Sequence, residues 1–120
     1  DGVDGIMKKI SETTRQYAEN CYKFAVSVME VCRYEDALLE LNKAIRMAPG
    51  NAKYRYQAGI ALQESGKPRN AIMQIKKAVK LEPNNAMYRR ELSRLLRLAG
   101  RYKAARKQRE IADTLYSERP

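Results

Sequence analysis

The chain of 120 residues contains no histidine and no tryptophan, and it has only two cysteines. Without histidine there is no imidazole to act as a general base or to activate a cysteine nucleophile. Two cysteines are too few ligands for a structural zinc site. The carboxylates are scattered, and those of Glu35, Asp36 and Glu40 lie where a helix is expected to begin and where its dipole favours them. We therefore expect no catalytic centre, no metal and no cofactor.

Long apolar segments are also absent. No run of 18 or more apolar residues occurs, which argues against a transmembrane helix, and the first residues lack the apolar centre of a signal peptide. A targeting segment upstream of Asp1 would not be visible. Cys21 and Cys32 would lie roughly 16 Å apart on one helix, which is too far for them to pair. Reduced thiols favour a reducing compartment, so we expect a cytoplasmic protein.

The chain is organised around a repeat of 34 residues. The residues that recur one period apart are Pro49 and Pro83, Gly66 and Gly100, Leu41 and Ile75, Ala37, Ala71 and Ala105, and Ala44, Ala78 and Ala112. A fixed period in this range is typical of stacked repeats.

Each repeat reads as two helices joined by a short turn. In the central copy, apolar residues recur at helical spacing over 53–64 and 68–81. Gly66 is expected to end the first helix, Pro68 to begin the second, and Pro83 to end it. The same pattern predicts helices over 17–31 and 34–47, and over 87–98 and 102–116. A single hairpin cannot bury its apolar faces alone, so the three hairpins are expected to stack.

These hairpins resemble the tetratricopeptide repeat. The residues that carry the family pattern are Ala58, Gly59, Leu62, Ala71, Ile75, Ala78 and Pro83 in the central copy, Phe24, Ala25, Val28, Ala37, Leu41, Ala44 and Pro49 in the first, and Leu92, Ser93, Leu96, Ala105 and Ala112 in the third. Three departures stand out. The family's early tryptophan is replaced by Cys21, Arg55 and Arg89, the first turn glycine by Cys32, and the last late apolar residue by Arg109.

The resemblance implies an all-α fold, a right-handed α-solenoid of helix-turn-helix hairpins. The repeats would occupy residues 18–51, 52–85 and 86–119, which form a single domain over 18–119. Residues 1–17 do not fit the repeat. We expect them to be an N-terminal extension or capping helix, begun by Asp4, that covers the exposed face of the first repeat with Ile6, Met7 and Ile10. The polar stretch over residues 11–14 can break this helix, or the helix can run straight into the next one.

The net charge of +10 is distributed unevenly. Residues 1–17 are neutral and residues 18–51 carry a charge of −1, whereas residues 52–85 carry +5 and residues 86–120 carry +6. An excess of this kind indicates an acidic partner or an acidic surface.

In the family, one ridge on the first helix of each hairpin lines a concave groove that holds a peptide. The ridge comprises Tyr22, Val26 and Met29 in the first copy, Tyr56, Ile60 and Gln63 in the second, and Arg90, Arg94 and Arg97 in the third. It changes from apolar to basic along the array, which suits a client segment that is both apolar and acidic. The resemblance therefore implies a non-catalytic interaction module, such as an adaptor, a chaperone-like protein or an assembly factor.

Other interpretations of these residues stay open. Tyr22, Val26 and Met29 can instead bury the N-terminal segment, which would then fill the groove, and the arginines can be a solvated face. Some family members clamp a C-terminal carboxylate with Lys and Asn. The matching positions hold Tyr22, Val26, Gln57, Met87 and Glu91, which argues against that role.

The dense basic set near the C-terminus, with Tyr88 and Tyr102 among it, suggests a rival class of function. Basic surfaces with aromatic residues bind single-stranded nucleic acid, and they also suit an anionic membrane. Nucleic acid is less favoured because the usual ligand of the resembled family is protein. Self-association is the remaining alternative, with the neutral N-terminal end of one copy meeting the charged end of another.

Overall fold

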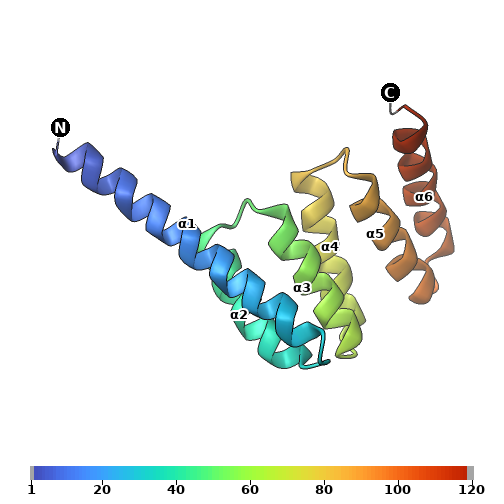
Figure 1. The fold of residues 1–120 in the computed structure, drawn as a ribbon. Helices are drawn as coiled ribbons and strands as arrows, with labels where there is room; N and C mark the ends of the chain where they lie inside the picture. The colour runs from blue at the N-terminus through green and yellow to red at the C-terminus, as the bar shows by residue number, and fades with distance from the viewer. Residues whose placement is uncertain (1, 119–120) are drawn as a thin grey trace.

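The computed structural model describes residues 2–118, and this part of the chain contains six α-helices and no strand. Figure 1 shows them as three hairpins placed side by side in chain order. The helices are α1 (Gly2–Met29), α2 (Tyr34–Met47), α3 (Ala52–Glu64), α4 (Pro68–Leu81), α5 (Ala86–Leu98) and α6 (Tyr102–Ser117). The expected all-α solenoid is therefore confirmed. Between residues 2 and 118, no helix combines the length and the apolar character that crossing a bilayer requires.

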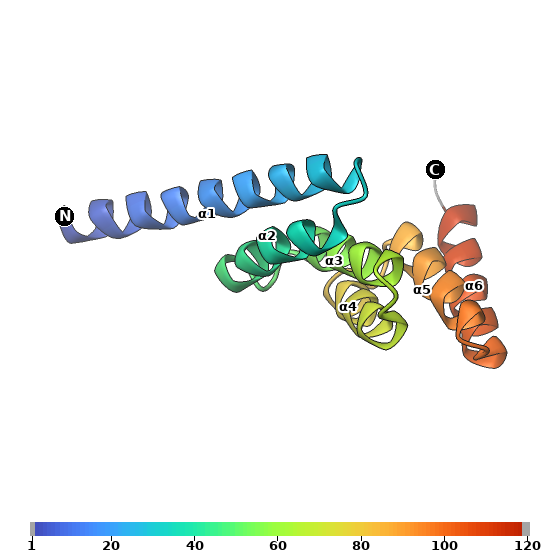
Figure 2. The same cartoon turned by 90° about the horizontal axis from the view of Figure 1, so that it is seen from below.

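The hairpins stack in two layers. The closest packing joins α1 to α2, α3 to α4 and α5 to α6, and the hairpins meet where α2 packs on α3 and α4 on α5. In Figure 2 the first helices of the hairpins lie on one side of the stack and the second helices on the other. This arrangement leaves one face of α1, α3 and α5 on the inner side of the curve.

The helix boundaries follow from local chemistry. The side chains of Asn51 and Asn85 accept hydrogen bonds from the backbone N–H groups of Lys53 and Tyr88, each at 3.1 Å, and so cap α3 and α5. Two residues after those helices end, Gly66 and Gly100 close the turn with positive φ angles of 80° and 78°. The same turn after α1 is made by Cys32, with φ of 61°. Cys32 thus lies beyond α1 and not on the helix of Cys21 as expected, and both cysteines are free.

The hairpin seams are built from small residues. The alanines that recur with the period, together with Leu41 and Ile75, are almost completely buried. At Gly59 an added Cβ would lie 2.5 Å from Cδ1 of Ile75 and 3.2 Å from the carbonyl oxygen of Ala71, so only glycine permits this approach of α3 to α4. The third copy has Ser93 there, and its hydroxyl donates to the carbonyl oxygen of Ala105 at 2.8 Å. The larger residue fits because exposed Arg109 stands where the second copy has Ile75.

Of the two alternatives for the N-terminal segment, the structure shows the one in which it runs straight into the next helix, and the expected cover over the first repeat is not formed by the described residues. Residues 2–17 do not form a short capping helix, because they continue without a break into α1, which is 28 residues long. The polar stretch that was a candidate break is accommodated in the helix, since Thr13 and Thr14 donate their hydroxyls to the carbonyl oxygens of Lys9 and Ile10 at 2.9 and 3.0 Å. Figure 1 shows this half of α1 projecting away from the stack. Ile6, Met7 and Ile10 are exposed and cover nothing among the described residues.

Phe24 also differs from the expectation, because it is exposed although the family pattern places a core residue there. The equivalent residues, Ala58 and Leu92, are buried. Ala58 lies in a cluster with α2, and Leu92 in one with α4, so each packs against the hairpin before it. The described residues contain no hairpin before α1, so no helix covers Phe24 in this way. The expected end of the third repeat, residue 119, lies outside the described residues.

Replacing Cys32 with glycine is expected to stabilise the protein by about 1 kcal/mol, because the left-handed conformation costs an ordinary residue about 1–2 kcal/mol and glycine nothing. Urea unfolding followed by circular dichroism measures the change. The converse substitution, Gly66→Ala, should lower stability by a similar amount. Equal stability of all three proteins would contradict this account of the turn.

Gly59→Val is expected to lower the free energy of unfolding by about 1–3 kcal/mol, because the added methyl groups overpack the contact with buried Ile75. Gly50→Val is the matched control, since a Cβ at Gly50 meets nothing within 4 Å. The control should change stability by less than about 0.5 kcal/mol. Equal effects at the two glycines would rule out close approach as the reason for Gly59.

Candidate functional site

The expected ridge lies on the inner layer and is open to solvent. Tyr22, Val26 and Met29 on α1, and Tyr56, Ile60 and Gln63 on α3, are all half-buried, so none is sealed in the core. In α5, Arg94 is half-buried and Arg90 and Arg97 are exposed. The N-terminal extension does not lie over Tyr22, Val26 and Met29, because its apolar residues are exposed and it projects outward (Figure 1). The interpretation in which this segment fills the groove therefore does not hold.

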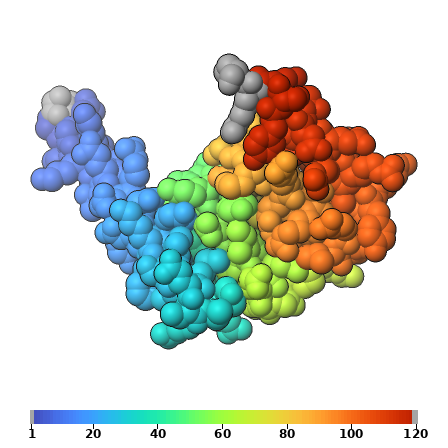
Figure 3. Space-filling model, turned by 45° about the vertical axis from the view of Figure 1, so that its right-hand side comes forward, coloured from blue at the N-terminus to red at the C-terminus, as the bar shows by residue number. Residues whose placement is uncertain are grey.

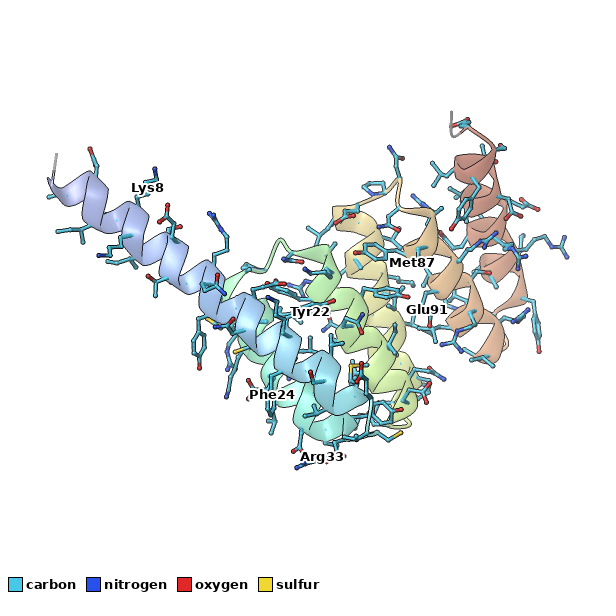
Figure 4. All side chains as sticks on the ribbon, in the orientation of Figure 1. Lys8, Tyr22, Phe24, Arg33, Met87 and Glu91 are labelled. Carbon is cyan, nitrogen blue, oxygen red and sulfur yellow. The ribbon has the colours of Figure 1, made fainter. Side chains whose placement is uncertain are left out.

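The ridge borders a hollow in the surface. Figure 4 shows Tyr22 of α1 on one side of α3, with Met87 and Glu91 of α5 on the other. The space-filling view in Figure 3 shows the surface hollowed between α1 and the C-terminal hairpin, above the second hairpin. We call this surface the inner groove and define its apolar part as Tyr22, Val26, Met29, Tyr56 and Ile60.

Two tyrosine pairs hold the aromatic part of the inner groove. The rings of Tyr22 and Tyr54 lie 5.3 Å apart, and those of Tyr56 and Tyr88 lie 4.9 Å apart and are stacked. Tyr54 and Tyr88 are buried, so each fixes a ridge tyrosine of the preceding hairpin from below. The sequence analysis missed these supporting residues. The sequence does contain a signal for them. Tyr54 and Tyr88 are 34 residues apart, and each lies two positions before a ridge residue.

A charged network lies beneath the first pair. Tyr54 donates its hydroxyl to Oε2 of Glu19 at 2.8 Å, and the Nζ of Lys53 lies 3.4 Å from Oε1 of Glu19 and 4.5 Å from the centre of the Tyr22 ring. The hydrogen bond from Tyr54 lowers the pKa of Glu19, and the positive charge of Lys53 acts in the same direction. Burial and the Glu19 carboxylate raise the pKa of Tyr54. The network fixes Tyr22 and Lys53 at the N-terminal end of the groove.

At the arginine end of the ridge, two of the three arginines already pair with carboxylates of the chain. Arg94 donates through Nε to both carboxylate oxygens of Glu91 at 3.1 Å, and this bond raises the pKa of Arg94. Arg90 lies 3.7 Å from Asp113, and its guanidinium lies 4.4 Å above the ring of Tyr116. For Arg97 no carboxylate partner occurs among residues 2–118.

These arginines enclose a small hollow. Its volume is about 200 Å³, and its lining is Arg90, Ser93, Arg94, Arg97 and Arg109. Asp113 lies beside this hollow, 3.5 Å from Arg109. Glu91 forms an ion pair with Arg94. Four guanidinium groups are thus matched by two carboxylates, so this end of the inner groove keeps a positive charge that an acidic ligand can neutralise.

The arginines that replace the family's early tryptophan have a structural role. Arg55 donates through Nε to the carbonyl oxygen of Pro49 and through Nη1 to Gln74, both at 3.3 Å. Arg89 makes the equivalent bonds to Pro83 and Gln108, at 2.7 and 2.8 Å. Each guanidinium therefore joins the preceding loop to the second helix of its own hairpin, which removes Arg89 from the candidate binding surface.

Comparison with known proteins supports the resemblance found in the sequence. The family model described as Tetratricopeptide repeat matches residues 56–112, and the chain has the three stacked hairpins with the 34-residue period described above. The resemblance of these hairpins to the tetratricopeptide repeat is therefore confirmed. No curated protein sequence matches it.

Solved structures share the fold of this repeat protein. MamA is 19% identical with a TM-score of 0.82, and the match covers 88% of this chain and 61% of MamA, so the chain spans less than two thirds of that protein. The Yersinia enterocolitica type III secretion chaperone SycD, in complex with a peptide of the translocator YopD, is 18% identical with a TM-score of 0.79, covering 85% of this chain and 78% of SycD. The second repeat domain of Spaghetti (RPAP3), bound to the HSP90 peptide SRMEEVD, is 16% identical with a TM-score of 0.83, covering 89% and 98%.

The contact between Glu19 and Tyr54 makes the stability of the repeat protein depend on pH. The folded pKa of Glu19 lies below its ordinary value of 4.5. The contact therefore stabilises the fold above that pH, and its contribution is lost as the pH falls through the folded pKa. Glu19→Gln should cost about 1–2 kcal/mol at neutral pH and nothing in strong acid. Urea unfolding at a series of pH values measures the difference.

The control for this series is Glu12→Gln, a change in the exposed extension. It should alter stability by less than about 0.5 kcal/mol at every pH. If the cost of Glu19→Gln stays constant from neutral to acid pH, the ionised carboxylate is not what stabilises the fold.

Proposed function

We propose that the chain is a non-catalytic interaction module that binds a short segment of a client protein in the inner groove. The observation that carries this proposal is the apolar part of the groove, five half-buried side chains on the inner faces of α1 and α3. Its tyrosines are held in place by buried tyrosines, so little side-chain entropy is lost when a ligand binds. Tyrosine is also among the residues that most often anchor interfaces.

The two ends of the groove define the chemistry of the segment. Apolar side chains of the client would pack on Tyr22, Tyr56 and Ile60. Its carboxylates would meet the four guanidinium groups at the other end, where Arg97 has no carboxylate of its own among the described residues. A short segment would bury under about 1,200 Å² in total, which is typical of transient binding.

The structural neighbours support peptide binding in this fold. SycD was solved with a peptide of YopD, and the repeat domain of Spaghetti with an HSP90 peptide. A ligand held by its terminal carboxylate does not suit this chain, because the positions of the Lys and Asn clamp hold Tyr22, Val26, Gln57, Met87 and Glu91 here. An internal segment with apolar residues fits the observed groove better.

The basic surface supports nucleic-acid or membrane binding less well. Arg89 is engaged by Pro83 and Gln108, and Arg94 by Glu91. Arg101, Lys103, Arg106 and Lys107 line a different hollow, at the start of α6. The basic residues are therefore divided between two hollows.

A fluorescein-labelled peptide with an apolar half and a glutamate-rich half tests the proposal by fluorescence anisotropy. We expect micromolar binding to the wild-type chain. Arg90→Glu combined with Arg97→Glu should weaken it at least about tenfold, because like charges then meet the glutamates. Ile60→Ala should weaken both this peptide and a version with lysine in place of glutamate.

The matched control is Lys103→Glu combined with Arg106→Glu, which changes the net charge equally at the other hollow. This protein should bind the peptide within about threefold of the wild type. Equal loss in the two double variants would show that net charge alone drives binding. Displacement of the peptide by a single-stranded oligonucleotide, with affinity falling linearly on a log–log salt plot, would favour the nucleic-acid interpretation.

A further inference from the structure

A row of large apolar side chains runs along the outside of α1. Its members are Val3, Ile10, Tyr17, Phe24 and Val31 in the turn that follows, exposed by 68%, 54%, 53%, 54% and 66% respectively. They are spaced by seven residues throughout. Between residues 2 and 118 nothing covers them. A regularly spaced apolar row of this length on a charged protein indicates an interaction surface.

The spacing of seven indicates that the partner is a helix. On a straight helix, residues seven apart drift by about 20° per repeat, so the row winds slowly around α1. A partner helix that supercoils around α1 follows such a row along its whole length. Neither an irregular peptide nor a flat surface would follow it in this way.

The length of the row identifies the partner helix. At 28 residues, α1 is about 42 Å long. The helices α2 to α6 have 13 to 16 residues, so a repeat helix stacked on α1 would cover only about half of the row. Among the described helices, only α1 itself matches the length. We propose that the chain forms a homodimer in which α1 pairs with α1 of a second copy.

The symmetry of the row and the charge of the chain favour an antiparallel pair. Tyr17 is the midpoint of the row, so antiparallel pairing places Tyr17 against its counterpart, Ile10 against Phe24 and Val3 against Val31. The contact between the two Tyr17 side chains then lies on the two-fold axis, and each of the other contacts occurs twice. Residues 1–17 are neutral, whereas residues 52–120 carry the excess of positive charge. Antiparallel pairing keeps the two charged bodies at opposite ends of the joined helices, and parallel pairing would place them side by side.

The dimer surface and the inner groove do not compete. Residues 22 and 24 are separated by about 200° around a helix, and Figure 4 shows Tyr22 on the side of α1 that faces α3 and Phe24 on the opposite side. A dimer would therefore keep both inner grooves accessible. An interface with most of a 28-residue helix on each side falls in the usual size range of stable complexes. The proposal does not depend on the function proposed for the groove.

Sedimentation equilibrium of the whole chain tests the dimer. We expect a mass twice that of the 13.8 kDa chain. Ile10→Lys combined with Phe24→Lys should raise the dissociation constant at least about tenfold, because two apolar contacts are replaced by charges. Leu39→Lys combined with Met73→Lys is the control. It makes the same change of charge at two exposed apolar residues of α2 and α4 and should leave the dimer intact.

Disulfide trapping tests the antiparallel register. In a Cys32→Ser background, the single variants Ile10→Cys and Phe24→Cys are oxidised separately and as a mixture. Antiparallel pairing predicts a cross-linked dimer in the mixture only. Cross-links within each variant alone would indicate parallel pairing and overturn the proposed arrangement.

Three further results would overturn the dimer itself. The first is a wild-type chain whose mass in sedimentation equilibrium is that of a monomer at all concentrations. The second is a mass that rises beyond two copies, as head-to-tail stacking predicts. The third is monomers that bind phosphatidylserine vesicles through the row on α1. Circular dichroism of the lysine variants separates loss of dimer from loss of fold.

Discussion

The structure depends on the close approach of two helices within each hairpin. This approach is possible because the residues at the crossing are alanine, glycine or serine, and the alanines that recur with the period are almost completely buried. The same seam returns every 34 residues, so each hairpin places its first helix in the same orientation as the last. The side chains four and eight residues after the start of each repeat therefore lie on one inner face. The groove is a consequence of the seams.

Substitutions that depart from the family pattern are compensated locally. Arg55 and Arg89 take the place of a large aromatic residue, and each ties a loop carbonyl to a glutamine of the second helix. The third hairpin replaces glycine and isoleucine at the seam with Ser93 and Arg109, and the serine hydroxyl is satisfied by a backbone carbonyl. These changes leave the backbone arrangement unaltered while turning the C-terminal end of the groove basic. The fold and the chemistry of its surface are thus decided by different residues.

The helix α1 connects the two proposed interaction surfaces. Its second half completes the first hairpin and contributes Tyr22, Val26 and Met29 to the groove, whereas its first half extends beyond the stack. In the proposed dimer, two grooves would be held at a fixed separation by the joined helices. A client with two suitable segments would then bind both, with an avidity that neither groove has alone.

The sequence by itself determined the repeat, the three hairpins and the helix boundaries to within two residues outside α1, because glycine, proline and asparagine act within one turn of the chain. It also placed the ridge residues on one face, since helical spacing is a local property. Only the tertiary structure decided that Tyr54 reaches Glu19, 35 residues away, and that Arg90 lies over Tyr116. It also decided that Phe24 and Ile10 are exposed, although their apolar character suggested burial. The physical reason is that an apolar residue is buried only where another element packs on it, and that element is distant in the chain or belongs to a partner.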